Sequence, residues 1–155
     1  MIRTDTTIGR DDPFDLSRFT SAQKGIYDSV LAELRGGRKR THWMWFIFPQ
    51  IEGLGHSPTA EYYAIKSVEE ARQYLNHPIL GARLLECAEA VLAVEGRSVA
   101  EIFGYPDDLK LKSSMTLFAS VAQNPHSVFI PVLEKYFQGE QDDRTLQLLA
   151  RLRDK

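Results

Sequence analysis

Two acidic segments could supply a catalytic carboxylate. Asp107 and Asp108 follow a Gly-Tyr-Pro turn at residues 104–106 and open a predicted helix. A carboxylate aimed from there into a cleft would steer water or stabilise positive charge on a sugar ring. Acids in a first helical turn are equally what helix stability alone selects, because they complement the partial positive charge of the N-terminus. The spacing leaves both interpretations open.

Glu61 is the second acidic candidate. It lies one turn into a short predicted helix that Pro58 opens, with Tyr63 and Lys66 nearby. Its i, i+4 neighbour is Ile65, so the carboxylate could flank apolar surface. The alternative, which the pattern favours, is an ordinary exposed glutamate near a helix N-terminus.

Residues 41–50 concentrate the aromatic side chains. This segment holds both tryptophans, Trp43 and Trp45, and two of the eight phenylalanines. Each aromatic side chain buries on the order of 150–250 Å², so the segment must anchor the core or form the wall of a pocket. His42 and Gln50 add polar groups at its two ends.

A basic loop at residues 35–40 precedes the aromatic segment. Gly36 and Gly37 allow close backbone approach, so the loop could hold a phosphate. The alternative is a solvated helix C-terminus, where cations complement the helix dipole. The four histidines have no metal-binding spacing and Cys87 has no neighbouring ligand. We therefore expect no metal and no cofactor.

Composition sets the class of protein. At 155 residues and 43% hydrophobic content, we expect one domain over residues 13–155, preceded by a polar flexible arm over residues 1–12. One cysteine suits a reducing cytoplasm. A net charge of −2 and a pI of about 6.1 make a polynucleotide partner unexpected, and no apolar run is long enough to span a membrane. The oligomeric state is not defined.

Nearly every periodic segment is helical, so we predict a mainly α, compact fold of about seven or eight helices. Residues 16–34 have one continuous helical pattern, which the glycines at 36 and 37 end. The other predicted helix starts are Ser57-Pro58, Ser67 with Glu70, residues 76–78, Ser98 with Glu101, the acids after Pro106, Asn124-Pro125, and Asp142 or Asp143. Residues 43–48, six large apolar residues before Pro49, fit either a buried helix or a short strand. We favour the helix because no partner strand of similar quality exists.

Several longer motifs carry a family resemblance. They occupy residues 42–50, 63–67, 74–78, 80–84, 102–110 and 113–118, in that order. Together they resemble bacterial domain-of-unknown-function family 1810, whose members are sometimes labelled calpastatin, over about residues 12–149. The label conflicts with the sequence, because a calpain inhibitor of that type is an extended disordered chain and this chain has enough periodic apolar residues for a core.

A weaker resemblance is to the NADAR superfamily, through an early aromatic segment, a Glu-aromatic-Tyr helix and an Asp-x-x-Lys segment before a methionine-containing helix. That superfamily is mainly helical and cleaves N-glycosidic bonds of ribosylated bases or ADP-ribose adducts. Glu61 matches the glutamate of its Glu-His-Tyr motif, with Tyr62 in the place of histidine. Asp107 or Asp108 matches its acidic position, and Met115 matches the methionine. The tryptophan that usually lies near the acidic position is missing.

The resemblance implies a small cytoplasmic N-glycosidase-like hydrolase with a pocket for a nucleotide-type ligand. Asp108 would be the catalytic carboxylate, with Glu61 as second choice. The substrate-binding residues would be His42, Trp43, Trp45, Gln50, Tyr63, Ser67, Arg83 and Lys110. The alternative is a non-catalytic ligand- or protein-binding module. The enzyme hypothesis expects Trp43, Trp45, Asp108 and Ser67 to meet in one concave site.

Overall fold

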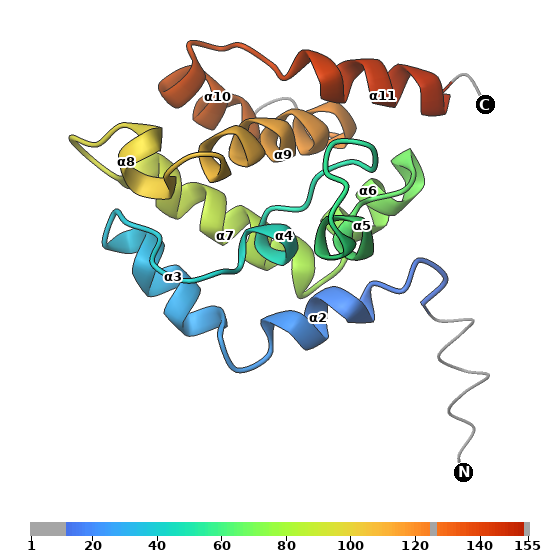
Figure 1. Cartoon of the computed structure of the whole chain (residues 1–155), viewed down its shortest axis with the longest axis horizontal. Coiled ribbons are helices and arrows are strands. Elements are labelled where there is room, and N and C mark those ends of the chain that lie inside the picture. Colours follow the sequence, from blue (N-terminus) through green and yellow to red (C-terminus); the bar gives the residue numbers. More distant parts are fainter. Residues whose placement is uncertain (1–11, 125–126, 154–155) are drawn as a thin grey trace.

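The computed structural model describes residues 12–124 and 127–153, and in these ranges the chain forms ten helices and no strand. The mainly α class is thus confirmed (Figure 1). The predicted N-terminal arm lies outside the described residues, except for Asp12. Seven helices have seven residues or more, and three are shorter. In chain order they are α2 Ser17–Gln23, α3 Tyr27–Arg35, α4 Met44–Ile47, α5 Pro58–Tyr63, α6 Val68–Asn76, α7 Leu80–Ala93, α8 Val99–Phe103, α9 Asp107–Val121, α10 Phe129–Phe137 and α11 Asp143–Arg153.

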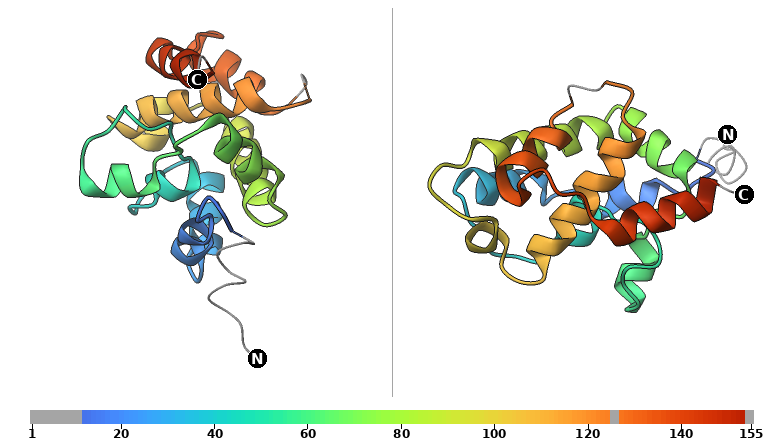
Figure 2. Two further views of the ribbon diagram at one scale, coloured as in Figure 1. Left: turned by 90° about the vertical axis from the view of Figure 1, so that its right-hand side faces the viewer. Right: turned by 90° about the horizontal axis from the view of Figure 1, so that it is seen from above.

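The helices are arranged around α7 and α9. Helix α9 packs against α6, α8, α10 and α11, while α7 packs against α3, α4, α6 and α10. The α10 and α11 helices lie beyond α9, and α2 and α3 lie on the opposite side of the molecule (Figures 1 and 2). The apolar faces enclose one core. None of the described helices is long and apolar enough to cross a lipid bilayer.

The predicted helix starts at serine are confirmed. Ser57 Oγ accepts a hydrogen bond from the N–H of Ala60 at the start of α5, and Ser67 Oγ accepts one at the start of α6. Ser98 and Glu101 form the complete reciprocal capping box of α8. Each cap satisfies N–H groups that the first turn leaves unpaired.

Two helix boundaries differ from the predictions. The continuous helix expected over residues 16–34 is two helices, α2 and α3, because Gly25 between them adopts a φ of +81°. Glycine adopts that left-handed conformation without strain, and a helix cannot continue through it. The start expected at Asn124-Pro125 is also wrong, since α10 begins at Phe129; Pro125 lies outside the described residues.

The aromatic segment forms a short helix, so the strand alternative for residues 43–48 is wrong. Met44–Ile47 is α4, and a single parallel bridge between Ile51 and Ile65 follows it. Ile65 donates its N–H to the carbonyl of Gln50 (2.9 Å) and accepts from the N–H of Glu52 (2.8 Å). The bridge closes the base of the loop that carries α5, which projects from the body of the molecule (Figure 2).

Candidate functional site

Three of the predicted ligand-binding side chains meet at one hollow in the surface. Trp45 from α4, Gln50 just before the bridge and Tyr63 at the end of α5 all line it, and all three are partly exposed. The other residues that line the hollow are Ile51, Gly55, Ala60 and Ala64. Its volume is about 10 Å³, which is room for about one water molecule.

The bridge at the base of the α5 loop brings these residues together. Because the Ile65 N–H binds the carbonyl of Gln50, the chain just after α5 is fixed beside the chain just after α4. Tyr63 is held by ring contacts with Phe19, Phe46 and Tyr62, at centroid distances of 5.7, 5.4 and 4.8 Å. Burial raises the pKa of the Tyr63 phenol, so this group is a hydrogen-bond donor at neutral pH.

Lys110, a fourth predicted residue, does not line the hollow but contacts the ring of Trp45. Its Nζ lies 4.8 Å from the centroid of the Trp45 ring and 3.4 Å from Oδ1 of Asp107. The other oxygen of Asp107 is 2.9 Å from Nζ of Lys39, and that ammonium lies 5.0 Å from the centroid of Trp43. The two tryptophans are therefore linked by a cation–carboxylate–cation chain. We call Lys39, Asp107 and Lys110 the charged triad.

Trp43 belongs to the core. Its side chain is 1% exposed, its ring packs against Phe48 and Phe103, and its Nε1–H donates to the carboxylate of Glu33 (2.9 Å). Glu33 also accepts from the N–H groups of Arg40 and Thr41 and from the Thr41 hydroxyl. Burial alone would raise the pKa of Glu33, but these hydrogen bonds outweigh it and lower the pKa.

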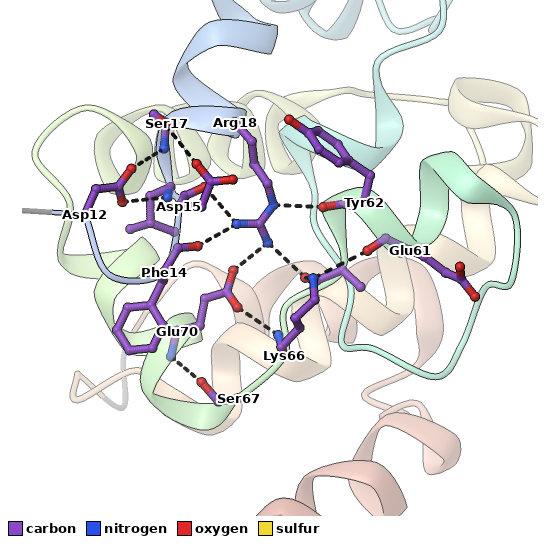
Figure 3. Close-up of polar contacts among 12 residues, drawn as sticks. Asp12, Phe14, Asp15, Ser17, Arg18, Glu61, Tyr62, Lys66, Ser67 and Glu70 are labelled. Atoms are coloured by element: carbon purple, nitrogen blue, oxygen red, sulfur yellow. Dashed lines mark hydrogen bonds and ion pairs between the residues drawn. The ribbon is translucent and has the colours of Figure 1, made fainter. Parts of the chain in front are cut away.

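The two candidate carboxylates do not line the hollow. Asp108 is partly exposed in the first turn of α9, and its Oδ1 accepts the N–H of the next residue, Leu109 (2.9 Å). Glu61 is exposed on α5, and its carboxylate points away from the neighbouring polar cluster around Arg18 (Figure 3).

Three further predicted residues, His42, Ser67 and Arg83, do not line the hollow. His42 is exposed in the loop before α4. Ser67 caps α6, and Arg83 donates to Oε1 of Gln23 (3.1 Å) with its guanidinium 4.6 Å from the centroid of Tyr27. The expected meeting of Trp43, Trp45, Asp108 and Ser67 in one hollow is not seen. Instead, Trp45, Gln50 and Tyr63 line one hollow, and Lys110 contacts the ring of Trp45.

Comparison with known proteins gives the family. The model of a family described as "Protein of unknown function (DUF1810)" matches residues 13–149. The chain belongs to this family. A crystal structure of a conserved hypothetical protein from Mycobacterium tuberculosis is similar at 58% sequence identity and a TM-score of 0.87, over 90% of this chain and 99% of that one. No curated protein matches the chain significantly.

A buried polar cluster in this DUF1810 domain is not predicted from the sequence. Arg18 of α2 is 7% exposed, and all five of its N–H donors are used. They bind the carbonyls of Phe14, Asp15, Tyr62 and Ala64 and Oε2 of Glu70 (2.6 Å) (Figure 3). A groove of about 500 Å³ runs beside this cluster, but Arg18 has no donor left for a ligand.

Glu70 differs from its expected role in a capping box. Its Oε1 accepts the N–H of Lys66 (2.9 Å), and its Oε2 is bound to Arg18. The carboxylate therefore joins α6 to α2 instead of binding the N–H of Ser67. No local pattern in the sequence indicates Arg18, because its acceptors lie on separate segments of the chain.

The single cysteine has no catalytic setting. Cys87 is completely buried, and its Sγ lies 3.8 Å from the hydroxyl of Tyr27. Burial raises the pKa of the Cys87 thiol to about 12, so it is not a thiolate at neutral pH. Among the described residues, no three His, Cys, Asp or Glu side chains are grouped so that they could hold a metal ion.

Proposed function

We propose that this protein binds a small nucleotide-type ligand at the surface around Trp45. The observation that supports this proposal is the meeting of Trp45, Gln50 and Tyr63 at one hollow, with the Lys110 ammonium 4.8 Å from the centroid of the indole. A flat aromatic surface, an amide, a phenol and a cation are the groups that a nucleobase and a phosphate require.

Each residue has a distinct role in this proposal. A base stacked on Trp45 gains roughly 1–3 kcal/mol, more than the roughly 0.5–1 kcal/mol of an exposed cation–π contact with Lys110. The Gln50 amide and the Tyr63 hydroxyl would hydrogen-bond the edge of the base. The hollow itself holds about 10 Å³, so a nucleotide would lie across it and over the indole. The projecting α5 loop would form its border.

The chemistry that the NADAR resemblance implies is hydrolysis of an N-glycosidic bond. The bond between the base and the ribose carbon breaks, positive charge develops on the sugar, water adds to that carbon, and the base leaves with a proton. A carboxylate near the ribose stabilises the developing charge. Asp108, two residues before Lys110, is the first candidate for that role, and Glu61 on the projecting α5 is the second.

The second candidate function is binding without turnover. The observation that favours it is the local bonding of Asp108, whose Oδ1 binds the N–H of Leu109, together with the burial of Trp43 in the core. In this case the protein would hold the ligand, and Asp108 would serve only as a helix-stabilising acid.

A thermal-shift titration with adenosine, AMP, ADP-ribose and NAD tests ligand binding. Ligand at 100 times its Kd should add about 2.7 kcal/mol to the free energy of unfolding, which corresponds to a rise in Tm of roughly 5–11 °C for a domain of this size. Trp45→Ala should abolish the rise, whereas Tyr105→Ala, which removes an aromatic ring that is 81% exposed, should leave it unchanged. The proposal would be contradicted if both variants lost the ligand-induced rise in Tm equally. It would also be contradicted if no compound at millimolar concentration raised the Tm of the wild-type protein.

A turnover assay on whichever compound binds separates the two functions. Asp108→Asn should retain the thermal shift and lose release of the free base if the protein is a hydrolase. Full turnover by this variant would remove Asp108 from the mechanism, and Glu61→Gln would then be tested in the same way. No base release by the wild-type protein would favour the binding module.

A further inference from the structure

The charged triad reaches the Trp45 indole through Lys110. We propose that Asp107 is a positioning residue that, fixed by Lys39, holds Lys110 over the Trp45 indole, so that the site takes an aromatic ring carrying an anionic group. This inference rests on the proposed function, because it concerns the ligand class of the same site.

Lys39 makes Asp107 a fixed point. The Lys39 side chain is 7% exposed, and its backbone N–H donates to the carbonyl of Ile102 (2.7 Å), which ties the basic loop to α8. Its ammonium is 2.9 Å from one oxygen of Asp107. A largely buried lysine requires a counter-charge, so Asp107 is held to it and only its other oxygen is free for Lys110.

Lys110 is held more weakly than Lys39. Its side chain is 25% exposed and its ammonium lies 3.4 Å from Asp107, a longer and more solvated pair. Its second contact is the indole of Trp45. An arriving aromatic ring can therefore take the place of the ammonium on the indole. Asp107 then keeps Lys110 beside the ring, where it can bind an anionic group of the same molecule.

The structure explains why Lys110, among the cations nearby, would perform this role. Lys39 is committed to Asp107 and Trp43. Lys112, two residues further along α9, is bound to Glu140 (2.9 Å) and lies 5.9 Å from the centroid of Phe137. Like Lys110, Lys112 is a lysine of α9 that pairs with a carboxylate and lies near an aromatic ring, but both of its partners are different residues. It therefore provides a matched control.

Acrylamide quenching of tryptophan fluorescence tests the positioning in ligand-free protein. The chain has two tryptophans, and Trp43 is buried, so Trp45 carries the accessible signal; Trp45→Phe supplies the background. Lys110→Met and Asp107→Asn should both increase quenching, whereas Lys112→Met and Glu140→Gln should not. An increase with Lys110→Met but none with Asp107→Asn would overturn the positioning role.

Asp107→Asn leaves Lys39 without its counter-charge and could unfold the protein. The double variant Lys39→Met/Asp107→Asn removes both charges and still lacks the anchor of Lys110. It should show the same increase in quenching as Asp107→Asn. If this folded double variant is quenched like the wild type, the positioning role is equally overturned.

Calorimetric titration with AMP and adenosine tests the ligand class. The wild-type protein should bind AMP about ten- to a hundredfold more tightly than adenosine, the value of one charge-assisted hydrogen bond. Lys110→Met should abolish this difference, Asp107→Asn should reduce it, and Lys110→Arg should preserve it. Equal affinity for both compounds in the wild type would overturn the inference while leaving the proposed function intact. Binding of neither compound would contradict the proposed function, and the quenching result would still decide the role of Asp107.

Discussion

Arg18 and Glu70 form an ion pair over 2.6 Å in which the two side chains are 5% and 3% exposed. Helix α2 supplies the arginine and α6 the glutamate. The other four N–H groups of Arg18 donate to main-chain carbonyls, those of Phe14, Asp15, Tyr62 and Ala64. This contact joins the N-terminal part of the chain to the segment that follows α5, and so it supports the Tyr63 side of the candidate site.

Removing Arg18 should destabilise the fold strongly. Arg18→Met leaves the Glu70 charge buried without a partner, and we expect a loss of about 3–5 kcal/mol in the free energy of unfolding, measured by urea denaturation. Arg72→Met is the control, because Arg72 on α6 has a 49% exposed side chain and a loose pair with Glu69 (3.8 Å). Arg72→Met should lower the free energy of unfolding by no more than about 0.5 kcal/mol. Similar losses in the two variants would refute the role given to Arg18.

Glu33 should make the free energy of unfolding depend on pH in the acid range. The hydrogen bonds that it accepts lower its pKa in the folded protein from the ordinary value of 4.5. This contribution is complete above pH 4.5 and is lost as the pH falls through the folded-state pKa. Glu33→Gln should therefore be less stable at neutral pH and show a smaller loss of stability on acidification, measured by urea denaturation from pH 7 to pH 3. Wild type and variant losing stability in parallel would contradict this account.

Cys87 should be unreactive in the folded protein. Its thiol is buried, and that burial raises its pKa to about 12, so little thiolate exists at pH 8. Since it is the only cysteine, labelling with a thiol-reactive disulfide reagent reports it alone. The reaction should be fast in denaturant and limited by unfolding without it. Rapid native labelling at pH 8 would show that the thiol is accessible.

Gly81 should tolerate no side chain. A Cβ at this position would lie 2.0 Å from the carbonyl oxygen of Leu75, because α7 starts close against the end of α6. Gly81→Ala should lower the free energy of unfolding, measured by urea denaturation, by about 3 kcal/mol. Ala82→Gly at the exposed neighbouring position should cost only about 1 kcal/mol. A stable Gly81→Ala variant would show that α6 and α7 can separate without penalty.

The sequence predicts the helices well where a local rule operates. Serine caps mark the starts of α5, α6 and α8, and Asp142 caps α11 by accepting from the N–H and hydroxyl of Thr145. His77 likewise helps α7 to start, since its Nδ1 accepts from the N–H groups of Ile79 and Leu80. The break at Gly25 is not predicted, because the apolar spacing continues across it.

The candidate site could be predicted only in part. Trp43 and Trp45 lie two residues apart, and at 3.6 residues per turn their side chains point to nearly opposite sides of a helix. The short helix Met44–Ile47, which Trp43 caps, therefore places one of them in the core and the other at the surface. The Lys39–Asp107 and Arg18–Glu70 pairs could not be predicted, because they join segments that only the tertiary fold brings together.

Titration of tryptophan fluorescence with AMP tests the central claim most directly. If the base stacks on Trp45, the emission should fall saturably in the wild type, and the fall should vanish in Trp45→Phe, where the buried Trp43 remains. Tyr105→Ala should behave as the wild type does. No saturable change in the wild type, or the same change in Trp45→Phe, would contradict a nucleotide-type site at Trp45.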